Sequence, residues 1–128
     1  MSKYSETNFF KSFGYALRGL KLAIKSQRNF RRQIFTAIIA IISAVLLKFS
    51  PTEFCIIVIV SGMVLFAELF NSVIEFTLDA TYKNNYSKLV EMAKDMAAGS
   101  VCVVSVCALT VGGILYLNKL ITLFQEIK

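Results

Sequence analysis

Three stretches of the chain contain no charged residue, and they limit the fold more than any other feature. They cover residues 33–47, 54–67 and 96–117. The last is 22 residues long, enough for an α-helix to cross a hydrocarbon layer of about 30 Å. Stretches that are apolar on every side suit lipid better than the core of a water-soluble protein. The sequence therefore predicts an all-α membrane protein with three transmembrane helices.

We expect a single domain, residues 1–128, in which an amphipathic helix precedes the three spans. The helix is expected at about residues 8–30 and the spans at about residues 33–50, 54–78 and 96–118. Pro51 ends the first span. A polar cytoplasmic loop at about residues 80–95 joins the last two spans, and Ser87 is expected to cap the helix that follows. No cleavable secretory signal is expected at the N-terminus.

The first helix has one apolar face and one basic face. Its apolar face covers an arc of about 80°, and we expect it to lie in the membrane interface against anionic headgroups. Packing of the apolar face on the protein's own helices is compatible with this placement. The two faces comprise Phe9, Phe13, Leu17, Leu20 and Ile24 on one side and Lys11, Arg18, Lys21, Lys25 and Arg28 on the other.

Positive charge is concentrated before the first span. Eight of the 14 Lys and Arg residues lie there, against a single acidic residue, Glu6. Because cytoplasmic segments next to membrane helices are rich in Lys and Arg, we expect a cytoplasmic N-terminus and, after three spans, an external C-terminus. Nucleic acid is not expected as a partner, since no recognisable nucleic-acid-binding module accompanies the basic residues.

The second span carries polar residues where lipid should surround it. Glu68, Asn71, Glu75 and Asp79 fall on one arc about 80° wide when the segment is drawn as a helix. Ionised groups at membrane depth are costly and usually functional. Three carboxylates at this spacing repel one another unless a cation lies between them. A polar seam that joins helices or fixes an oligomer is the structural alternative.

Several classes of chemistry are excluded by the residues present. The chain has no His, so a His-based catalytic triad is impossible. Cys55, Cys102 and Cys107 lack metal-ligand spacing and are expected to be packing residues. Neither a P-loop nor a protein-kinase glycine-rich loop is present.

Carboxylates together with Lys94 and Asp95 are groups that bind magnesium and a polyphosphate. The residues therefore favour phosphoryl transfer by a site built from helices. A small oligomeric transporter or ion pathway that uses the same carboxylates is the alternative from another class.

The spacing Glu68-x-x-Asn71-x-x-x-Glu75-x-x-x-Asp79, followed by Ala93-Lys94-Asp95-Met96-Ala97-Ala98-Gly99, closely resembles the prokaryotic diacylglycerol kinase and undecaprenol kinase family of small integral-membrane lipid kinases. The stretches Phe13-Gly14-Tyr15-Ala16-Leu17-Arg18-Gly19-Leu20 and Arg28-Asn29-Phe30-Arg31 also match it. The resemblance covers nearly the whole chain.

This resemblance implies a homotrimer in the bacterial cytoplasmic membrane, with active sites shared between neighbouring subunits, ATP as phosphoryl donor, Mg²⁺ as cofactor and a membrane lipid alcohol as substrate. Glu68 matches the general base, with Asn71 beside it, and Glu75 matches a magnesium ligand. A carboxylate removed from water is a competent base for an alcohol. The residues matching nucleotide-binding positions are Lys94 and Asp95, which contact phosphates, and Tyr15, Tyr86 and Ser87.

Gln27 departs from the family pattern, because a second metal-binding carboxylate belongs at this position. An amide oxygen can coordinate Mg²⁺ but brings no charge, so weaker metal binding is expected. Gln33 and the stretch 85–87 depart as well. A degenerate relative without catalysis is therefore an alternative. The substrate is undecaprenol or diacylglycerol, and the Arg28-Asn29-Phe30-Arg31 stretch favours undecaprenol.

Overall fold

A computed structural model describes residues 8–83, 85 and 87–128. Over these residues the chain forms four α-helices, α1 (Phe9–Ser26), α2 (Arg28–Leu46), α3 (Pro51–Tyr82) and α4 (Lys88–Ile127). Within the described part, α2, α3 and α4 are long and apolar enough to cross a membrane. The prediction of an all-helical membrane protein is confirmed, and the chain is a multi-pass membrane protein.

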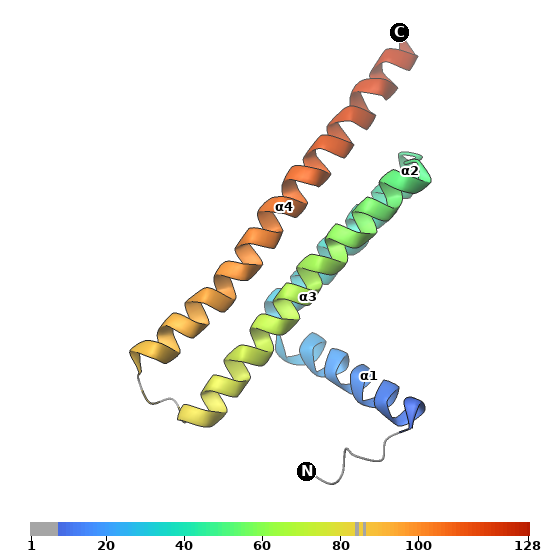
Figure 1. Ribbon diagram of the computed structural model, residues 1–128. Coiled ribbons are helices and arrows are strands. Elements are labelled where there is room, and N and C mark those ends of the chain that lie inside the picture. The colour runs from blue at the N-terminus through green and yellow to red at the C-terminus, as the bar shows by residue number, and fades with distance from the viewer. Residues whose placement is uncertain (1–7, 84, 86) are drawn as a thin grey trace.

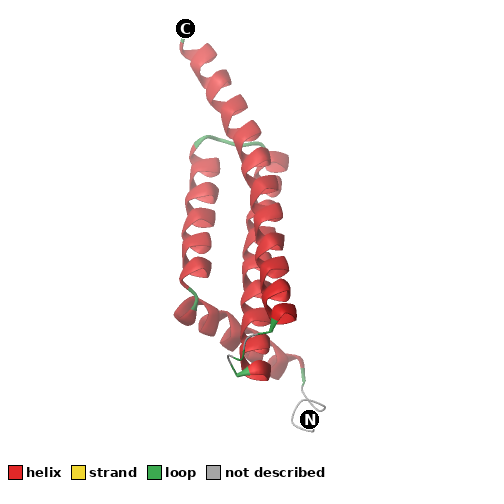
Figure 2. Ribbon diagram, turned by 90° about the vertical axis from the view of Figure 1, so that its left-hand side faces the viewer, coloured by secondary structure: helices red, strands yellow, loops and turns green. Residues whose placement is uncertain are grey.

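The three long helices run side by side, and α1 lies across their direction (Figure 1). α3 packs against both α2 and α4, so it occupies the middle of the bundle. The C-terminal end of α4 extends past the loop between α2 and α3 (Figure 2). Because α3 has a helix on either side, polar residues along it can meet groups from both neighbours.

α3 and α4 continue beyond the spans expected from the apolar pattern. α3 reaches Tyr82 and α4 starts at Lys88, so most of the polar segment at residues 80–95 is helical rather than loop. α1 ends at Ser26 and α2 begins at Arg28, earlier than expected in both cases. Apolar residues mark the part of a helix that suits lipid, whereas the helix ends where its backbone is capped or broken. After α3, Lys83 supplies the break with a left-handed φ of 48°.

The α2–α3 loop is closed by a capping box at the start of α3. The Glu53 carboxylate accepts a hydrogen bond from the Ser50 N–H at 2.8 Å, and the Ser50 hydroxyl accepts one from the Glu53 N–H at 3.3 Å. Pro51 occupies the first helical position, where a missing N–H costs nothing. These bonds fix the direction in which α3 leaves the loop.

Tyr116 joins α4 to α2 near this loop. Its hydroxyl donates to the Ala40 carbonyl and lies 2.9 Å from the Ser43 hydroxyl. Its ring packs on Phe49 with 4.8 Å between the ring centroids. Interhelical hydrogen bonds of this kind contribute to helix association in a membrane, where the hydrophobic effect does not drive helices together.

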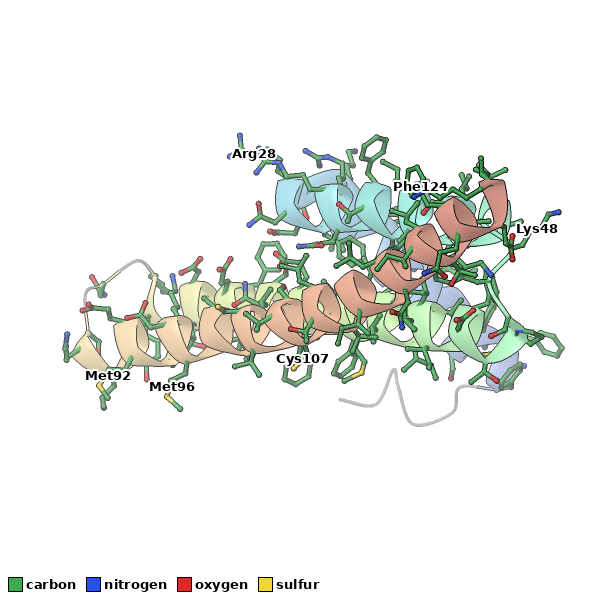
Figure 3. The ribbon with its side chains drawn as sticks, turned by 90° about the horizontal axis from the view of Figure 1, so that it is seen from above. Arg28, Lys48, Met92, Met96, Cys107 and Phe124 are labelled. Carbon is green, nitrogen blue, oxygen red and sulfur yellow. The ribbon has the colours of Figure 1, made fainter. Side chains whose placement is uncertain are left out.

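Few side chains of the single chain are buried. Within the part of the chain that the structure describes, seven hydrophobic residues and two polar ones, Glu68 and Ser72, are buried. Met92 and Met96 point away from the other helices (Figure 3). The three cysteines are free and exposed, so they do not act as packing residues within the single chain. The outer surface is suited to contact with lipid or with further copies of the chain.

Candidate active site

The acidic face of α3, made of Glu68, Asn71, Glu75 and Asp79, runs from the interior of the bundle to the α3–α4 turn. Glu68 is only 5% exposed, Asn71 and Glu75 are half-buried, and Asp79 is exposed. Exposure thus rises from Glu68 to Asp79. The face connects a carboxylate enclosed among helices with one open to water.

Asn71 and Glu75 are in direct contact one helical turn apart. The Asn71 amide Nδ2 donates to Glu75 Oε1 at 3.3 Å, as expected for polar residues at i and i+4. The amide oxygen of Asn71 is buried and has no hydrogen-bond partner among the described residues. Because buried oxygens are normally satisfied, this unpaired acceptor indicates a position for a ligand that the oxygen would contact.

A pocket of about 300 Å³ lies at the turn between α3 and α4. It combines two predicted site residues, Ser87 and Lys94, with Asp79 from the end of the acidic face. Tyr82 adds an aromatic ring. The remaining lining residues are Leu78, Asn85, Val90 and Glu91. The pocket therefore combines one ammonium and two carboxylates with hydroxyl and amide groups and a ring, which suits a polar ligand.

Lys94 is held at this pocket by Asp79. Its ammonium Nζ lies 2.5 Å from Asp79 Oδ1, and both side chains are partly exposed. The sequence placed both residues near the same end of the bundle but did not identify the pair. Asp79 belongs to the predicted acidic face, whereas Glu91 was not among the predicted site residues.

Among the residues that the structure describes, the others predicted to bind the nucleotide do not line this pocket. Asp95 follows Lys94 but is exposed and does not line the pocket. Tyr86 lies outside the described residues. On α1, Tyr15 lines a separate hollow of about 270 Å³ with Lys11, Gly14 and Arg18, and the Arg18 guanidinium lies 5.7 Å from the centre of its ring. The pocket that contains Lys94 therefore does not include Tyr15 within the described part of one chain.

Gln27 is the single residue between α1 and α2. It is half-buried and has an extended backbone, with φ −108° and ψ 106°. Its backbone N–H donates to the Ala23 carbonyl at 2.9 Å. Gln27 is thus at the point where the chain turns from the direction of α1 into the bundle.

An apolar groove of about 600 Å³ lies between α3 and α4. Ala67, next to Glu68, is one of its lining residues. The others are Ile59, Gly62, Met63, Phe66, Phe70, Ser100 and Val104. The groove therefore extends along the bundle from the level of the buried carboxylate.

Oxygen donors for a magnesium ion are present on α3. Glu75 offers a carboxylate and Asn71 an unpaired amide oxygen. In residues 8–83, 85 and 87–128, no group of three or more Asp, Glu, His and Cys side chains is close enough to hold a metal. Mg²⁺ usually binds through one or two carboxylates and completes its shell with water and substrate phosphates. The donors of α3 fit such a shared site.

Comparisons with known proteins agree with this architecture. The prokaryotic diacylglycerol kinase family matches residues 14–116. A diacylglycerol kinase of Synechocystis sp. is 37% identical over 116 residues, which are 91% of this chain and 66% of that protein. The undecaprenol kinase of Bacillus subtilis is 37% identical over 112 residues, 88% of this chain and 90% of that protein. A diacylglycerol kinase of Haemophilus influenzae is 31% identical over 111 residues, 86% of this chain and 93% of that protein.

The fold and these matches define the class of this protein, which is a small lipid kinase embedded in the membrane. The chain belongs to the prokaryotic diacylglycerol kinase family.

Proposed function

We propose that the chain transfers the γ-phosphoryl group of ATP to the hydroxyl of a membrane lipid alcohol, with Glu68 as general base. One observation carries the proposal. The acidic face of α3 begins at a carboxylate buried beside an apolar groove and ends at a polar pocket that contains Lys94. Such an arrangement lets a lipid and a water-soluble donor approach the same helix from opposite directions.

Glu68 is suited to accept the proton of the lipid hydroxyl. It is enclosed by the bundle, and the groove lined by Ala67 and Phe70 supports an approach by a hydrocarbon chain. A positioned carboxylate that removes a proton from the attacking oxygen typically accelerates a reaction by about 10²–10⁴-fold. Glu68 then returns the proton to water after each turnover.

The pocket at the α3–α4 turn is suited to the phosphates of ATP. Lys94 supplies positive charge, Ser87 and Asn85 supply hydrogen-bonding groups, and Tyr82 offers a ring for the base. Asp95 lies next to Lys94, and Tyr86 belongs to the same turn in the sequence. Phosphoryl transfer depends mainly on positioning and charge neutralisation, so these groups would act by holding the donor in line with the lipid hydroxyl.

Mg²⁺ would be held by Glu75 and Asn71, with Gln27 as a further oxygen donor. When bound, it neutralises charge on the transferring phosphoryl group. Tyr15 and Gln27 come from the α1 end of the chain, outside the pocket that contains Lys94. In a homotrimer, a neighbouring subunit would supply Tyr15 and Gln27 to each site. The N-terminus of each subunit would be cytoplasmic.

Both lipid alcohols named for the relatives are candidate substrates. The matched proteins are called diacylglycerol kinase and undecaprenol kinase at the same identity of 37%. The apolar groove fits a hydrocarbon chain of either lipid, since its lining contains no charged side chain. We favour undecaprenol on the strength of the Arg28-Asn29-Phe30-Arg31 stretch.

The decisive experiment offers both lipids in parallel to purified protein in mixed micelles with ATP and Mg²⁺. Wild-type protein should phosphorylate at least one lipid, and Glu68→Ala should abolish the product. Glu126→Ala removes an exposed carboxylate at the end of α4 and should retain activity. Activity that survives in Glu68→Ala would contradict the base assignment, and phosphorylation of neither lipid by the wild type would favour a degenerate relative.

A further inference from the structure

The junction between α1 and α2 is held by Arg31. Its guanidinium Nη1 donates to two carbonyls in the last turn of α1, to Ile24 at 2.9 Å and to Lys25 at 3.0 Å. Its backbone N–H donates to the Gln27 carbonyl at 3.2 Å. One residue in the first turn of α2 thus binds both the last turn of α1 and the carbonyl of Gln27.

These bonds replace the usual end of a helix. Helices commonly end on a left-handed Gly whose neighbouring N–H groups satisfy the last carbonyls. α1 ends instead on Gln27, whose extended backbone satisfies only the Ala23 carbonyl. The guanidinium supplies the missing donors, and its positive charge faces the negative end of the α1 dipole.

The contact sets a direction as well as closing a helix end. α1 leaves the bundle at a steep angle to α2 (Figure 1), and Phe30 and Ala23 are buried on either side of the junction. Since only Gln27 separates the two helices, a change in their angle must move Gln27. The bonds of Arg31 resist such a change, because their donor belongs to α2 and their acceptors to α1.

We propose that Arg31 is a positioning residue, which holds α1 and Gln27 in the orientation that Mg-ATP binding requires. This inference rests on the proposed function, because Gln27 and Tyr15 are residues through which Mg-ATP would be bound. Arg31 contacts neither the lipid nor the nucleotide in this role. It acts through the main chain of the junction, which carries Gln27 directly and Tyr15 through the helix α1.

Arg32 provides a matched control. It is the next residue on the same helix and carries the same charge, and its side chain makes no hydrogen bond or ion pair with any residue that the structure describes. Arg31→Gln and Arg32→Gln therefore lower the net charge equally but differ in their effect on the junction. Arg31→Lys keeps the charge and loses the planar fork of donors.

The test combines a structural and a kinetic measurement. Spin labels at Lys21→Cys and Leu46→Cys, in a background without Cys55, Cys102 and Cys107, report the angle between α1 and α2 in vesicles diluted with unlabelled protein. Arg31→Gln should broaden the distance distribution, Arg31→Lys should broaden it less, and Arg32→Gln should leave it unchanged. In the unlabelled variants, Arg31→Gln should raise KM for Mg-ATP about tenfold with a smaller effect on KM for lipid, the order expected for lost charge-assisted hydrogen bonds. Arg31→Lys should restore part of that loss.

Three outcomes overturn the proposal. The first is an unchanged distance distribution in Arg31→Gln, and the second is a broadened distribution with an unchanged KM for Mg-ATP. The third is an Arg32→Gln variant that broadens the distribution and raises KM for Mg-ATP as much as Arg31→Gln does. If Arg31→Gln fails to fold, Arg31→Lys decides by the same criteria. Absence of lipid phosphorylation in the wild type would contradict the proposed function alone, because the distance measurement still reports whether Arg31 holds the junction.

Discussion

Lys94 and Asp79 form an ion pair across the α3–α4 turn, with 2.5 Å between Nζ and Oδ1. They are fifteen residues apart in the chain, yet they line the same pocket. The pair keeps the only lysine that lines this pocket, among the described residues, directed toward α3. A phosphate group that enters the pocket must share this ammonium with Asp79.

Lys94→Ala should weaken ATP binding strongly. The substitution removes the cation of the pocket and leaves the Asp79 carboxylate to repel the phosphates. We expect KM for ATP to rise at least about tenfold, with a smaller change in KM for lipid. Kinetics in mixed micelles measure both constants. Lys128→Ala is the control, because Lys128 is exposed at the far end of α4 and does not line the pocket. A twofold or smaller effect of Lys94→Ala would contradict its role in phosphate binding.

Gln27→Glu should lower the Mg²⁺ concentration needed for half-maximal activity. A carboxylate binds Mg²⁺ more strongly than an amide oxygen because it carries charge. We expect a decrease of about tenfold, the order given by one added charge–charge contact. Magnesium titrations at saturating ATP measure the effect. Gln125→Glu, an exposed change at the end of α4, should leave the titration as in the wild type. An unchanged curve for Gln27→Glu would remove Gln27 from the metal site.

Gly62→Phe should impair the use of the lipid while sparing ATP. A Cβ at Gly62 meets no other atom within 4 Å, and Gly62 lines the apolar groove, so a larger side chain at this position would occupy part of the groove. We expect KM for lipid to rise about tenfold, a typical cost of obstructing an apolar pocket. Gly113→Phe, also in open space on α4 and outside the groove lining, is the control. Equal kinetics of the two variants would show that the substrate chain lies elsewhere.

Tyr116→Phe should destabilise the bundle without affecting catalysis directly. It removes the hydroxyl that bonds to the Ala40 carbonyl and Ser43 but keeps the ring against Phe49. We expect the free energy of unfolding to fall by about 1 kcal/mol. Unfolding in mixed detergent and SDS, followed by circular dichroism, measures this loss. Thr110→Val removes a hydroxyl that bonds only within α4, to the Val106 carbonyl, and should cost less. A smaller loss in Tyr116→Phe than in Thr110→Val would contradict a tie between helices.

The fold was predictable because lipid imposes a simple rule on the sequence. Uncharged stretches such as residues 96–117 can form little else than membrane helices. Helix ends were harder to predict, since they depend on contacts rather than on polarity. The break at Gln27 has neither Gly nor Pro beside it. It depends on the burial of Phe30 and on the side chain of Arg31, and the sequence pattern gave Arg31 no role in ending a helix.

The candidate site was predictable where helical spacing decides geometry. The contact between Asn71 and Glu75 follows from their separation of four residues. The pairing of Lys94 with Asp79 joins two different helices, α4 and α3, and spacing along one helix does not give such a pairing. Tyr15 and Gln27 depend on a further step, the arrangement of several chains, so their assignment to the nucleotide and metal stays a prediction.

The unequal lengths of the helices have a mechanical consequence. α4, with 40 residues, is about 60 Å long, whereas α2, with 19 residues, is about 28 Å long. Arg28, at the start of α2, and Lys48, just after the end of α2, point outward (Figure 3). The match between helix length and bilayer thickness is therefore tightest for α2, which is no longer than a bilayer of about 30 Å is thick. A thicker bilayer would first draw inward the charges that flank the uncharged residues 33–47, which are Arg32 and Lys48. The vertical position of the whole protein in the membrane is therefore set by its shortest span.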